Sequence, residues 1–175
     1  MLRGKIACLS PFSEADGEML FSWINERELV MSSAPFRPVH HTCHLEWFNA
    51  IQKRSDIVIF GIRRSADDCL VGSCQLHSIS PIHRSAELQI RIGRKNAQGS
   101  GIGTEVCSLL LHHAFQDLNL SRVYLHVFET NERAISLYTR AGFKVEGTLR
   151  NSVFIDGRWI NVVIMAILRE EYPNT

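Results

Sequence analysis

Apolar and polar positions follow two different periods along the chain, and the changes of period divide it into helices and strands. Apolar residues three or four positions apart predict helices over residues 16–27, 41–53 and 131–141, and a fourth after the glycine-rich segment 98–103. Shorter apolar runs predict strands over residues 5–9, 57–62, 70–79, 86–92 and 122–128. Two longer strands, residues 143–155 and 158–168, flank Asp156-Gly157, a dipeptide that favours a two-residue hairpin turn.

The same pattern predicts which side chains each helix buries. The first two helices are expected to turn these residues inward: Met19, Leu20 and Trp23, then Leu45, Phe48 and Ile51. The helix after the glycines repeats apolar residues at every fourth position: Ile102, Val106, Leu110, Ala114 and Leu118. Residues 28–39 contain Pro35 and Pro38 and are expected to form a loop. The order of about seven strands and about four helices predicts one α/β domain over residues 1–175.

Composition narrows the possible classes of protein. With 175 residues, 45% of them hydrophobic and 21% charged, the chain is long enough for a core and ordinary for a globular protein. A net charge of +1 gives no general case for binding nucleic acid or a membrane. The five cysteines have no framework spacing and predict a reducing cytoplasm with mostly buried thiols. The apolar run at the N-terminus is too short for a signal peptide, and no segment approaches a membrane span.

Three glycines at alternate positions open the central helix: Gly99, Gly101 and Gly103. A glycine within a helix costs ~1 kcal/mol relative to alanine, so the cluster needs a compensating purpose. Backbone N–H groups in the first turn of a helix have no partner, and glycine lets an anion approach them. The cluster therefore predicts a phosphate-bearing ligand, with a tight turn that binds nothing as the alternative. The segment lacks the Lys-Ser/Thr of a Walker loop and the third glycine of a Rossmann fingerprint.

Two motifs give the chain a resemblance to a known family. Gln98 to Gly103, QGSGIG, resembles the Q/R-x-x-G-x-G/A motif with which the GNAT N-acetyltransferase superfamily binds the pyrophosphate of acetyl-CoA. The segment NERAISLYTRAGF, residues 131–143, is similarly typical of that family. The resemblance is greatest to its ribosomal-protein, polyamine and nucleotide-amino-sugar branch. It implies the GNAT acyl-CoA N-acyltransferase fold, with a mixed and mostly antiparallel sheet.

The resemblance implies an enzyme that transfers the acetyl group of acetyl-CoA to a primary amine by direct attack in a ternary complex. The expected acceptor is a small molecule, an amino sugar or a polyamine, with a protein N-terminus as an alternative. A regulatory module that binds acyl-CoA without turnover is the alternative from another class. Relatives are often dimers, so a homodimer is compatible with the resemblance.

The family motif implies that Tyr138 protonates the departing thiolate. Its helical spacing with Ala134 and Ala141 also suits a core residue. Glu87 matches the strand glutamate that some members use as general base, with a water-mediated route as the alternative. Because strand side chains alternate, Glu87, Gln89 and Arg91 share one face, which could equally be a solvated face of the sheet.

Cofactor contacts are implied along the same strand and loop. The backbone N–H of Ile90 or a neighbour is expected to meet the thioester carbonyl, and Asn131 to cap its helix and touch pantetheine. The full expected set of cofactor-binding residues is Ile90, Arg91, Ile92, Arg94, Gln98, Gly99, Ser100, Gly101, Ile102, Gly103, Thr104 and Asn131.

The histidine-rich segment HHTCH, residues 40–44, invites a metal interpretation, because His40 and His44 are four positions apart. No second cluster offers the remaining ligands, so a helix start with exposed histidines is expected and no metal is assigned. The acceptor pocket of this fold lies between the first two helices, their joining loop and the last strands. That directs attention to these residues: Trp23, Asn25, Pro35 to Val39, His44 and Trp47.

Overall fold

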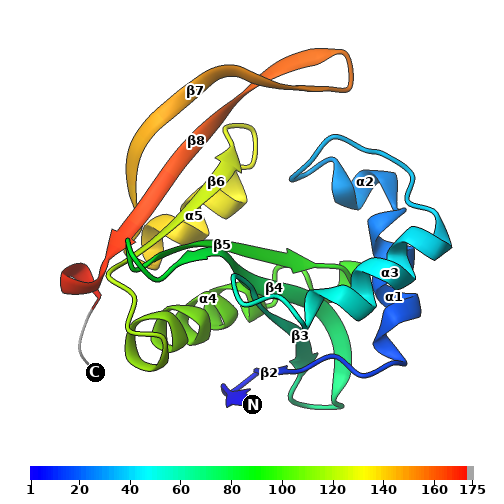
Figure 1. Ribbon diagram of the computed structural model, residues 1–175. Helices are drawn as coiled ribbons and strands as arrows, with labels where there is room; N and C mark the ends of the chain where they lie inside the picture. Colours follow the sequence, from blue (N-terminus) through cyan, green and yellow to red (C-terminus); the bar gives the residue numbers. More distant parts are fainter. Residues whose placement is uncertain (173–175) are drawn as a thin grey trace.

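The computed structural model describes residues 1–172, which form an eight-stranded sheet flanked by helices (Figure 1). The strands are β1 (Leu2–Arg3), β2 (Ala7–Ser10), β3 (Val58–Arg64), β4 (Cys69–Ser80), β5 (Ser85–Ile92), β6 (Arg122–Phe128), β7 (Lys144–Ile155) and β8 (Arg158–Leu168). Their order across the sheet is β1-β2-β3-β4-β5-β6-β8-β7. Every neighbouring pair is antiparallel except β5 and β6, which are parallel. The expected mixed, mostly antiparallel sheet is confirmed.

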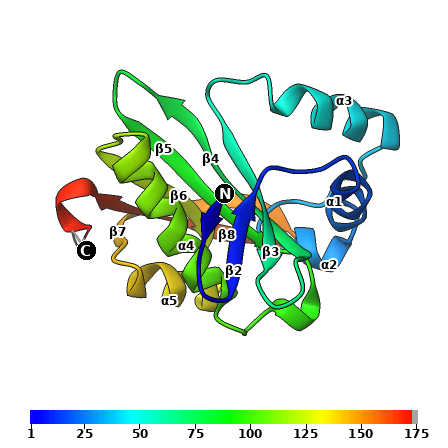
Figure 2. The same cartoon turned by 90° about the horizontal axis from the view of Figure 1, so that it is seen from below.

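The α-helices are α1 (Asp16–Ile24), α2 (Arg27–Val30), α3 (His41–Ile51), α4 (Ile102–His112) and α5 (Glu132–Arg140). Short 3-10 turns cover Lys95–Ala97 and Arg169–Glu171. In Figure 2, α4 and α5 lie together on one side of the molecule, and α1 and α3 lie on the other. The sequence pattern missed β1 and α2, because two and four residues are too few to show a period. No helix among residues 1–172 has both the length and the apolar character needed to cross a bilayer.

Helix α4 packs its apolar stripe on the sheet and forms the centre of the core. Ile102, Val106, Leu110 and Ala114 are all at most 2% exposed, as the spacing predicted. The helix continues into a π-helical turn, His113–Asp117, in which the Leu118 N–H donates to the His113 carbonyl oxygen at 3.0 Å. A residue repeated at every fourth position drifts around an α-helix, and the wider π turn compensates by rotating less per residue.

Helix α3 presents a different face from the one predicted. Leu45 is 43% exposed, whereas His44 is only 4% exposed and lies with Phe48 and Ile51 against α1. The prediction of an inward Leu45 and exposed histidines is therefore wrong at residues 44 and 45. His44 can be buried because its Nε2–H donates to the Gly17 carbonyl oxygen at 2.9 Å, which satisfies the polar nitrogen.

The cysteines also depart from expectation. Only Cys74 and Cys107 are buried within the described residues, and Cys43 is exposed on α3, so the prediction of mostly buried thiols is wrong. Cys43 directly precedes His44, which is the buried residue of that helix turn. The identity of a single cysteine does not predict whether it faces the core or the solvent. All five thiols are free.

The N-terminal segment is fastened to the start of α4. The Glu105 carboxylate accepts hydrogen bonds from three backbone N–H groups, those of Lys5, Ile6 and Ala7, at 2.6, 2.9 and 2.7 Å. Charge-assisted bonds of this kind are stronger than neutral ones. Glu105 therefore holds residues 5–7 beside the glycine-rich turn.

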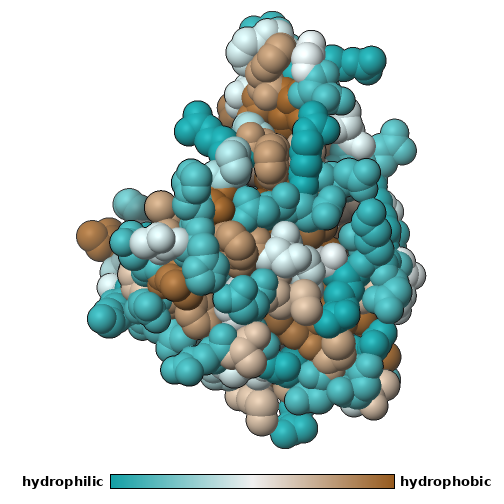
Figure 3. All heavy atoms as spheres, turned by 90° about the vertical axis from the view of Figure 1, so that its right-hand side faces the viewer, coloured by the Kyte–Doolittle hydropathy of each residue, from teal (hydrophilic) through white to brown (hydrophobic). Residues whose placement is uncertain are grey.

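The β7–β8 hairpin extends past the rest of the sheet and curves over it (Figure 1). Its tip reaches α2, where Arg27 donates to Asp156 at 2.9 Å, and Met31, directly after α2, packs against a buried cluster of Phe128, Ile155 and Val162. The rings of Phe154 and Trp159 are in tilted contact at the tip, with centroids 5.3 Å apart, and remain 53% and 61% exposed. Figure 3 shows hydrophobic residues gathered at this end. The hairpin thus bridges the two sides of the molecule.

Candidate active site

Strands β5 and β6 pair at one end and then separate (Figure 1). Their register runs only from Ser85 to Glu87 on β5, opposite Arg122 to Tyr124 on β6. Beyond Glu87, residues 88–92 remain paired with β4 and have no strand on the other side within the described residues. An extended ligand can hydrogen bond to such an open edge as a further strand would. Ile90 and Ile92 lie on this open stretch, as the cofactor assignment requires.

The glycine-rich turn lies directly after this stretch. Gly99 and Gly101 have φ values of +83° and +88°, a left-handed conformation that favours glycine. The N–H groups of Thr104 and Glu105 both donate to the Gly101 carbonyl oxygen. Within residues 1–172 the N–H groups of Ile102 and Gly103 have no recorded backbone acceptor. These donors at the positive end of α4 suit a diphosphate.

The third glycine has a packing reason of its own. A Cβ on Gly103 would lie 3.0 Å from Leu137 Cδ1, so its absence lets α4 approach α5 closely. A tight turn alone does not require this contact. The cluster therefore combines two unusual backbone conformations with one close helix approach.

The positive charge near the turn comes from a residue that the sequence did not single out. Arg94, which the resemblance assigned to the cofactor, donates from Nε to the Leu70 carbonyl oxygen at 2.8 Å, and the neighbouring Lys95 binds Glu28 at 3.0 Å, so both cations have partners elsewhere. Arg133, in the first turn of α5, lies over the loop, with its Nη2 3.2 Å from where a Cβ on Gly99 would be. It lies in the quoted family motif, but only the packing of α5 on α4 shows what it faces.

Other predicted cofactor residues shape the loop itself. Gln98 Nε2 donates to the Ile92 carbonyl oxygen at 3.2 Å, and Ser100 Oγ donates to the Ala97 carbonyl oxygen at 2.7 Å. Asn131 caps α5 as predicted, accepting from the Ala134 N–H at 3.1 Å. The contacts of these residues with acetyl-CoA remain predictions.

Tyr138 is 9% exposed and packs edge-to-face on Phe143, with ring centroids 5.6 Å apart. Among residues 1–172 its hydroxyl makes no hydrogen bond to the protein, and the oxygen is not fully enclosed. Burial, and secondarily the nearby Cys107 thiol, raise the pKa of the Tyr138 hydroxyl well above its usual value. The phenol is therefore protonated at neutral pH.

Glu87 does not lie on an open solvated face. His126 Nδ1–H donates to Glu87 Oε1 at 2.8 Å, and His77 Nε2 lies 4.0 Å from Oε2. The Glu87 side chain is only 21% exposed. Tyr124 lies beside it, and burial, followed by the Glu87 charge, raises the pKa of that phenol.

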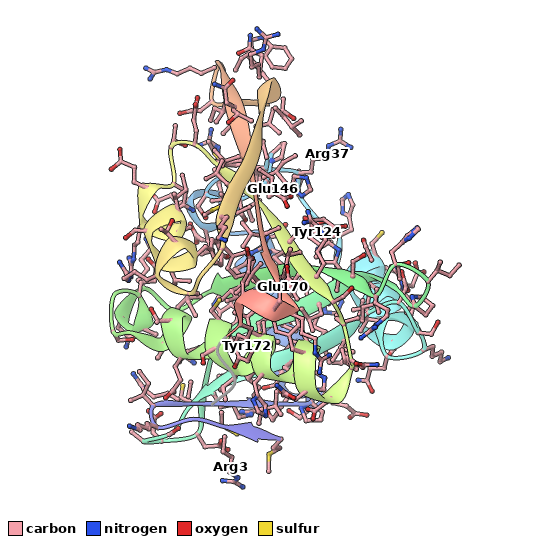
Figure 4. All side chains as sticks on the ribbon, turned by 90° about the vertical axis from the view of Figure 1, so that its left-hand side faces the viewer. Arg3, Arg37, Tyr124, Glu146, Glu170 and Tyr172 are labelled. Carbon is pink, nitrogen blue, oxygen red and sulfur yellow. The ribbon has the colours of Figure 1, made fainter. Side chains whose placement is uncertain are left out.

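Sequence reasoning missed His77, His126 and Tyr124, which come from strands on either side of β5. Alternation along β6 was the available signal, since Tyr124 and His126 share the face opposite the buried Val123 and Leu125. In Figure 4, Tyr124 lies on the side of β6 away from α5.

The two predicted catalytic residues lie on opposite faces of the sheet. Tyr138 belongs to the core that also contains Ala86 and Leu88 of β5. Glu87 alternates with these residues and points to the other face. The separation of β5 and β6 therefore lies between a proton acceptor on one face and a proton donor on the other.

A cavity of about 600 Å³ adjoins Glu87 between the sheet and helices α1 and α3. It is lined by four residues that the sequence assigned to the acceptor pocket: Trp23, Val39, His44 and Trp47. Asn25 does not line it but holds the loop in place, accepting from the Val39 N–H at 2.9 Å. Arg91, expected to bind cofactor, directs its side chain into this cavity. No group of three His, Cys, Asp or Glu side chains in residues 1–172 is arranged to hold a metal.

The sequence matches the family Acetyltransferase (GNAT) domain over residues 7–144. Spermidine N(1)-acetyltransferase of Vibrio cholerae is 42% identical over 105 residues, which are 60% of this chain and 60% of that protein. The protein of the same name from Escherichia coli K12 is 40% identical over 101 residues, 58% of this chain and 54% of that protein. The matched region thus spans 54–60% of the length of these curated relatives.

A crystal structure of spermidine N-acetyltransferase from Vibrio cholerae, in complex with CoA and spermine, resembles this chain along nearly its whole length. The TM-score is 0.89 at 30% sequence identity, covering 95% of this chain and 97% of that one. A putative ribosomal N-acetyltransferase of Bacillus subtilis is 32% identical over 106 residues, 61% of this chain and 57% of that protein.

Proposed function

Because the chain belongs to the GNAT acetyltransferase family, we propose that it is an acetyl-CoA-dependent N-acetyltransferase acting on the primary amine of a small molecule. The observation that carries the proposal is the separation of β5 and β6, with the glycine-rich turn at its end and Glu87 and Tyr138 on either side. When bound, acetyl-CoA supplies the acetyl group as an activated thioester.

The chain's own residues would share the work. The Ile102 and Gly103 N–H groups and the Arg133 guanidinium bind the diphosphate, and the open edge of β5 binds the pantetheine arm. A backbone N–H of β5, at or near Ile90, stabilises negative charge on the thioester oxygen.

Proton transfers fall to the two faces of the sheet. A free alkylamine has a pKa of ~10, so the acceptor must lose a proton before it attacks. Glu87 accepts that proton, directly or through water, while His126 orients its carboxylate. Tyr138 donates its hydroxyl proton to the sulfur as the carbon–sulfur bond breaks.

The comparisons support more than one acceptor. The polyamine relatives support spermidine or spermine, and the Bacillus relative, a putative ribosomal N-acetyltransferase, supports a ribosomal acceptor. The volume and partly aromatic lining of the cavity favour a small molecule such as an amino sugar. The five free thiols suit a reducing compartment such as the cytoplasm.

The test is release of CoA thiol from acetyl-CoA in the presence of a panel of amines. The panel contains polyamines, amino sugars, aminoglycosides and peptides with free N-termini. Release that depends on one amine class supports the proposal. Tight acetyl-CoA binding without release for any amine would favour a non-catalytic module.

A further inference from the structure

The cavity beside Glu87 has an unusual charge balance for a site that binds an amine. Its lining residues within the described chain include Arg54, Arg91, His44 and His77, but no aspartate or glutamate. Polyamines carry a positive charge at every amine, and carboxylates would be needed to compensate those charges. Glu87 does not line the cavity itself, but its Oε2 lies 4.0 Å from Nε2 of His77, which does.

The two arginines of the cavity differ in their partners. Arg54 is already neutralised, because its Nε and Nη2 donate to the two oxygens of Asp56 at 2.9 and 2.6 Å. Arg91 makes no ion pair among residues 1–172, and its recorded partner is Ser33 Oγ at 3.3 Å from Nη2. Burial lowers the pKa of the Arg91 guanidinium, which shows that the group is partly removed from water. A desolvated cation of this kind is stabilised by an anion brought to it.

Arg91 and Glu87 lie on the same face of β5, with Gln89 between them. At ~3.3 Å per residue, their Cα atoms are about 13 Å apart along the strand. Gln89 accepts from Gln75 Nε2 at 2.7 Å, and both amides line the cavity. The face therefore runs from a carboxylate through neutral hydrogen-bonding groups to a cation.

We propose that the acceptor is a primary amine that also carries a phosphate or carboxylate, bound by Arg91, on a body of about the size of a sugar. The proposal rests on the proposed function and names its substrate class. The amine lies toward Glu87, hydroxyl groups face Gln75 and Gln89, and the anion accepts hydrogen bonds from the Arg91 fork. A polyamine would place a second cation beside Arg91.

The test compares glucosamine 6-phosphate with glucosamine, two acceptors that differ only in the anion, with spermidine as a third. Initial rates of CoA release are measured for the parent protein, Arg91→Gln, Arg91→Lys and the control Arg140→Gln, an exposed arginine of α5. We expect kcat/KM to be at least tenfold higher for the phosphorylated sugar in the parent protein and the control. The preference should vanish in Arg91→Gln and survive in part in Arg91→Lys.

Equal or better turnover of glucosamine or spermidine by the parent protein would overturn the inference, as would an unchanged preference in Arg91→Gln. Calorimetric binding of glucosamine 6-phosphate to the CoA-loaded protein separates this inference from the proposed function. Binding that is lost in Arg91→Gln, without turnover of any amine, supports the anion site and refutes the transferase. Turnover without any preference for the phosphate supports the transferase and refutes the anion site.

Discussion

Replacing Tyr138 by phenylalanine separates the catalytic role of this residue from its packing role. The ring that packs on Phe143 is retained, and the hydroxyl has no recorded protein partner, so no internal hydrogen bond is lost. We therefore expect the free energy of unfolding to change by less than the ~1 kcal/mol of a typical hydrogen bond. If the hydroxyl protonates the sulfur, kcat should fall by on the order of 10²-fold while acetyl-CoA affinity is kept.

Tyr172 provides a matched control on the same side of the sheet. Its ring packs on Phe115, with centroids 5.2 Å apart, and remains partly buried against the same core. Tyr172→Phe keeps this ring contact, so the free energy of unfolding should change by less than ~1 kcal/mol and kcat should be unchanged. Chemical denaturation gives the free energy of unfolding of each variant, and steady-state kinetics gives its kcat. A parent-like kcat in Tyr138→Phe, with the amine saturating, would refute the acid role and leave the cofactor site intact.

Three further predictions concern binding and stability. Acetyl-CoA should raise the melting temperature because it binds the folded chain and not the unfolded one. At one hundred times its Kd it should add about 2.7 kcal/mol to the free energy of unfolding, and NADH or ATP should add far less. Arg133→Ala should weaken acetyl-CoA binding on the order of tenfold by calorimetry, whereas Arg140→Ala should not, because only Arg133 faces the glycine-rich turn. Burial raises the pKa of Cys107 to about 12, so its contribution to stability is complete below the unfolded thiol's pKa and is lost as pH rises from ~9 toward 12. Cys107→Ala should flatten this alkaline fall in melting temperature, and Cys43→Ser, at an exposed thiol, should leave it as steep.

Local patterns in the sequence were enough to predict most of the architecture. The bounds predicted for β6 and β8 agree with the structure, because each has a clear apolar pattern and the Asp156-Gly157 turn fixes where β8 begins. The glycine-rich turn could be assigned to an anion because its chemistry is contained in a few consecutive residues. The Asn131 cap was predictable for the same reason.

What the sequence did not reveal depends on contacts between distant segments. His126 on β6 donates to Glu87 on the neighbouring strand β5, and Arg133 lies over Gly99 because α5 packs on α4. The phase of α3 was missed because a histidine with a buried carbonyl partner behaves as an inward residue, and the partner, Gly17, lies on another helix. Polar residues in general are placed by such partners, which no single-segment pattern contains.

The Glu105 contact also has a consequence for how the protein forms during synthesis. Its carboxylate joins residues separated by 98 to 100 positions, and β2, apart from its short pairing with β1, finds its sheet partner in β3. On a ribosome adding 5–20 residues per second, residues 5–7 must wait roughly 5–20 s for residue 105 to be made. Residues 5–7, which bind Glu105 beside the glycine-rich turn, are therefore synthesised early but reach their native contact late. The cofactor cradle is completed by a contact of high sequence separation, a kind that folds slowly. Because the donors are backbone N–H groups, the variant that removes the contact is Glu105→Ala, which should slow the appearance of acetyl-CoA binding in a refolding experiment more than it slows the formation of helix.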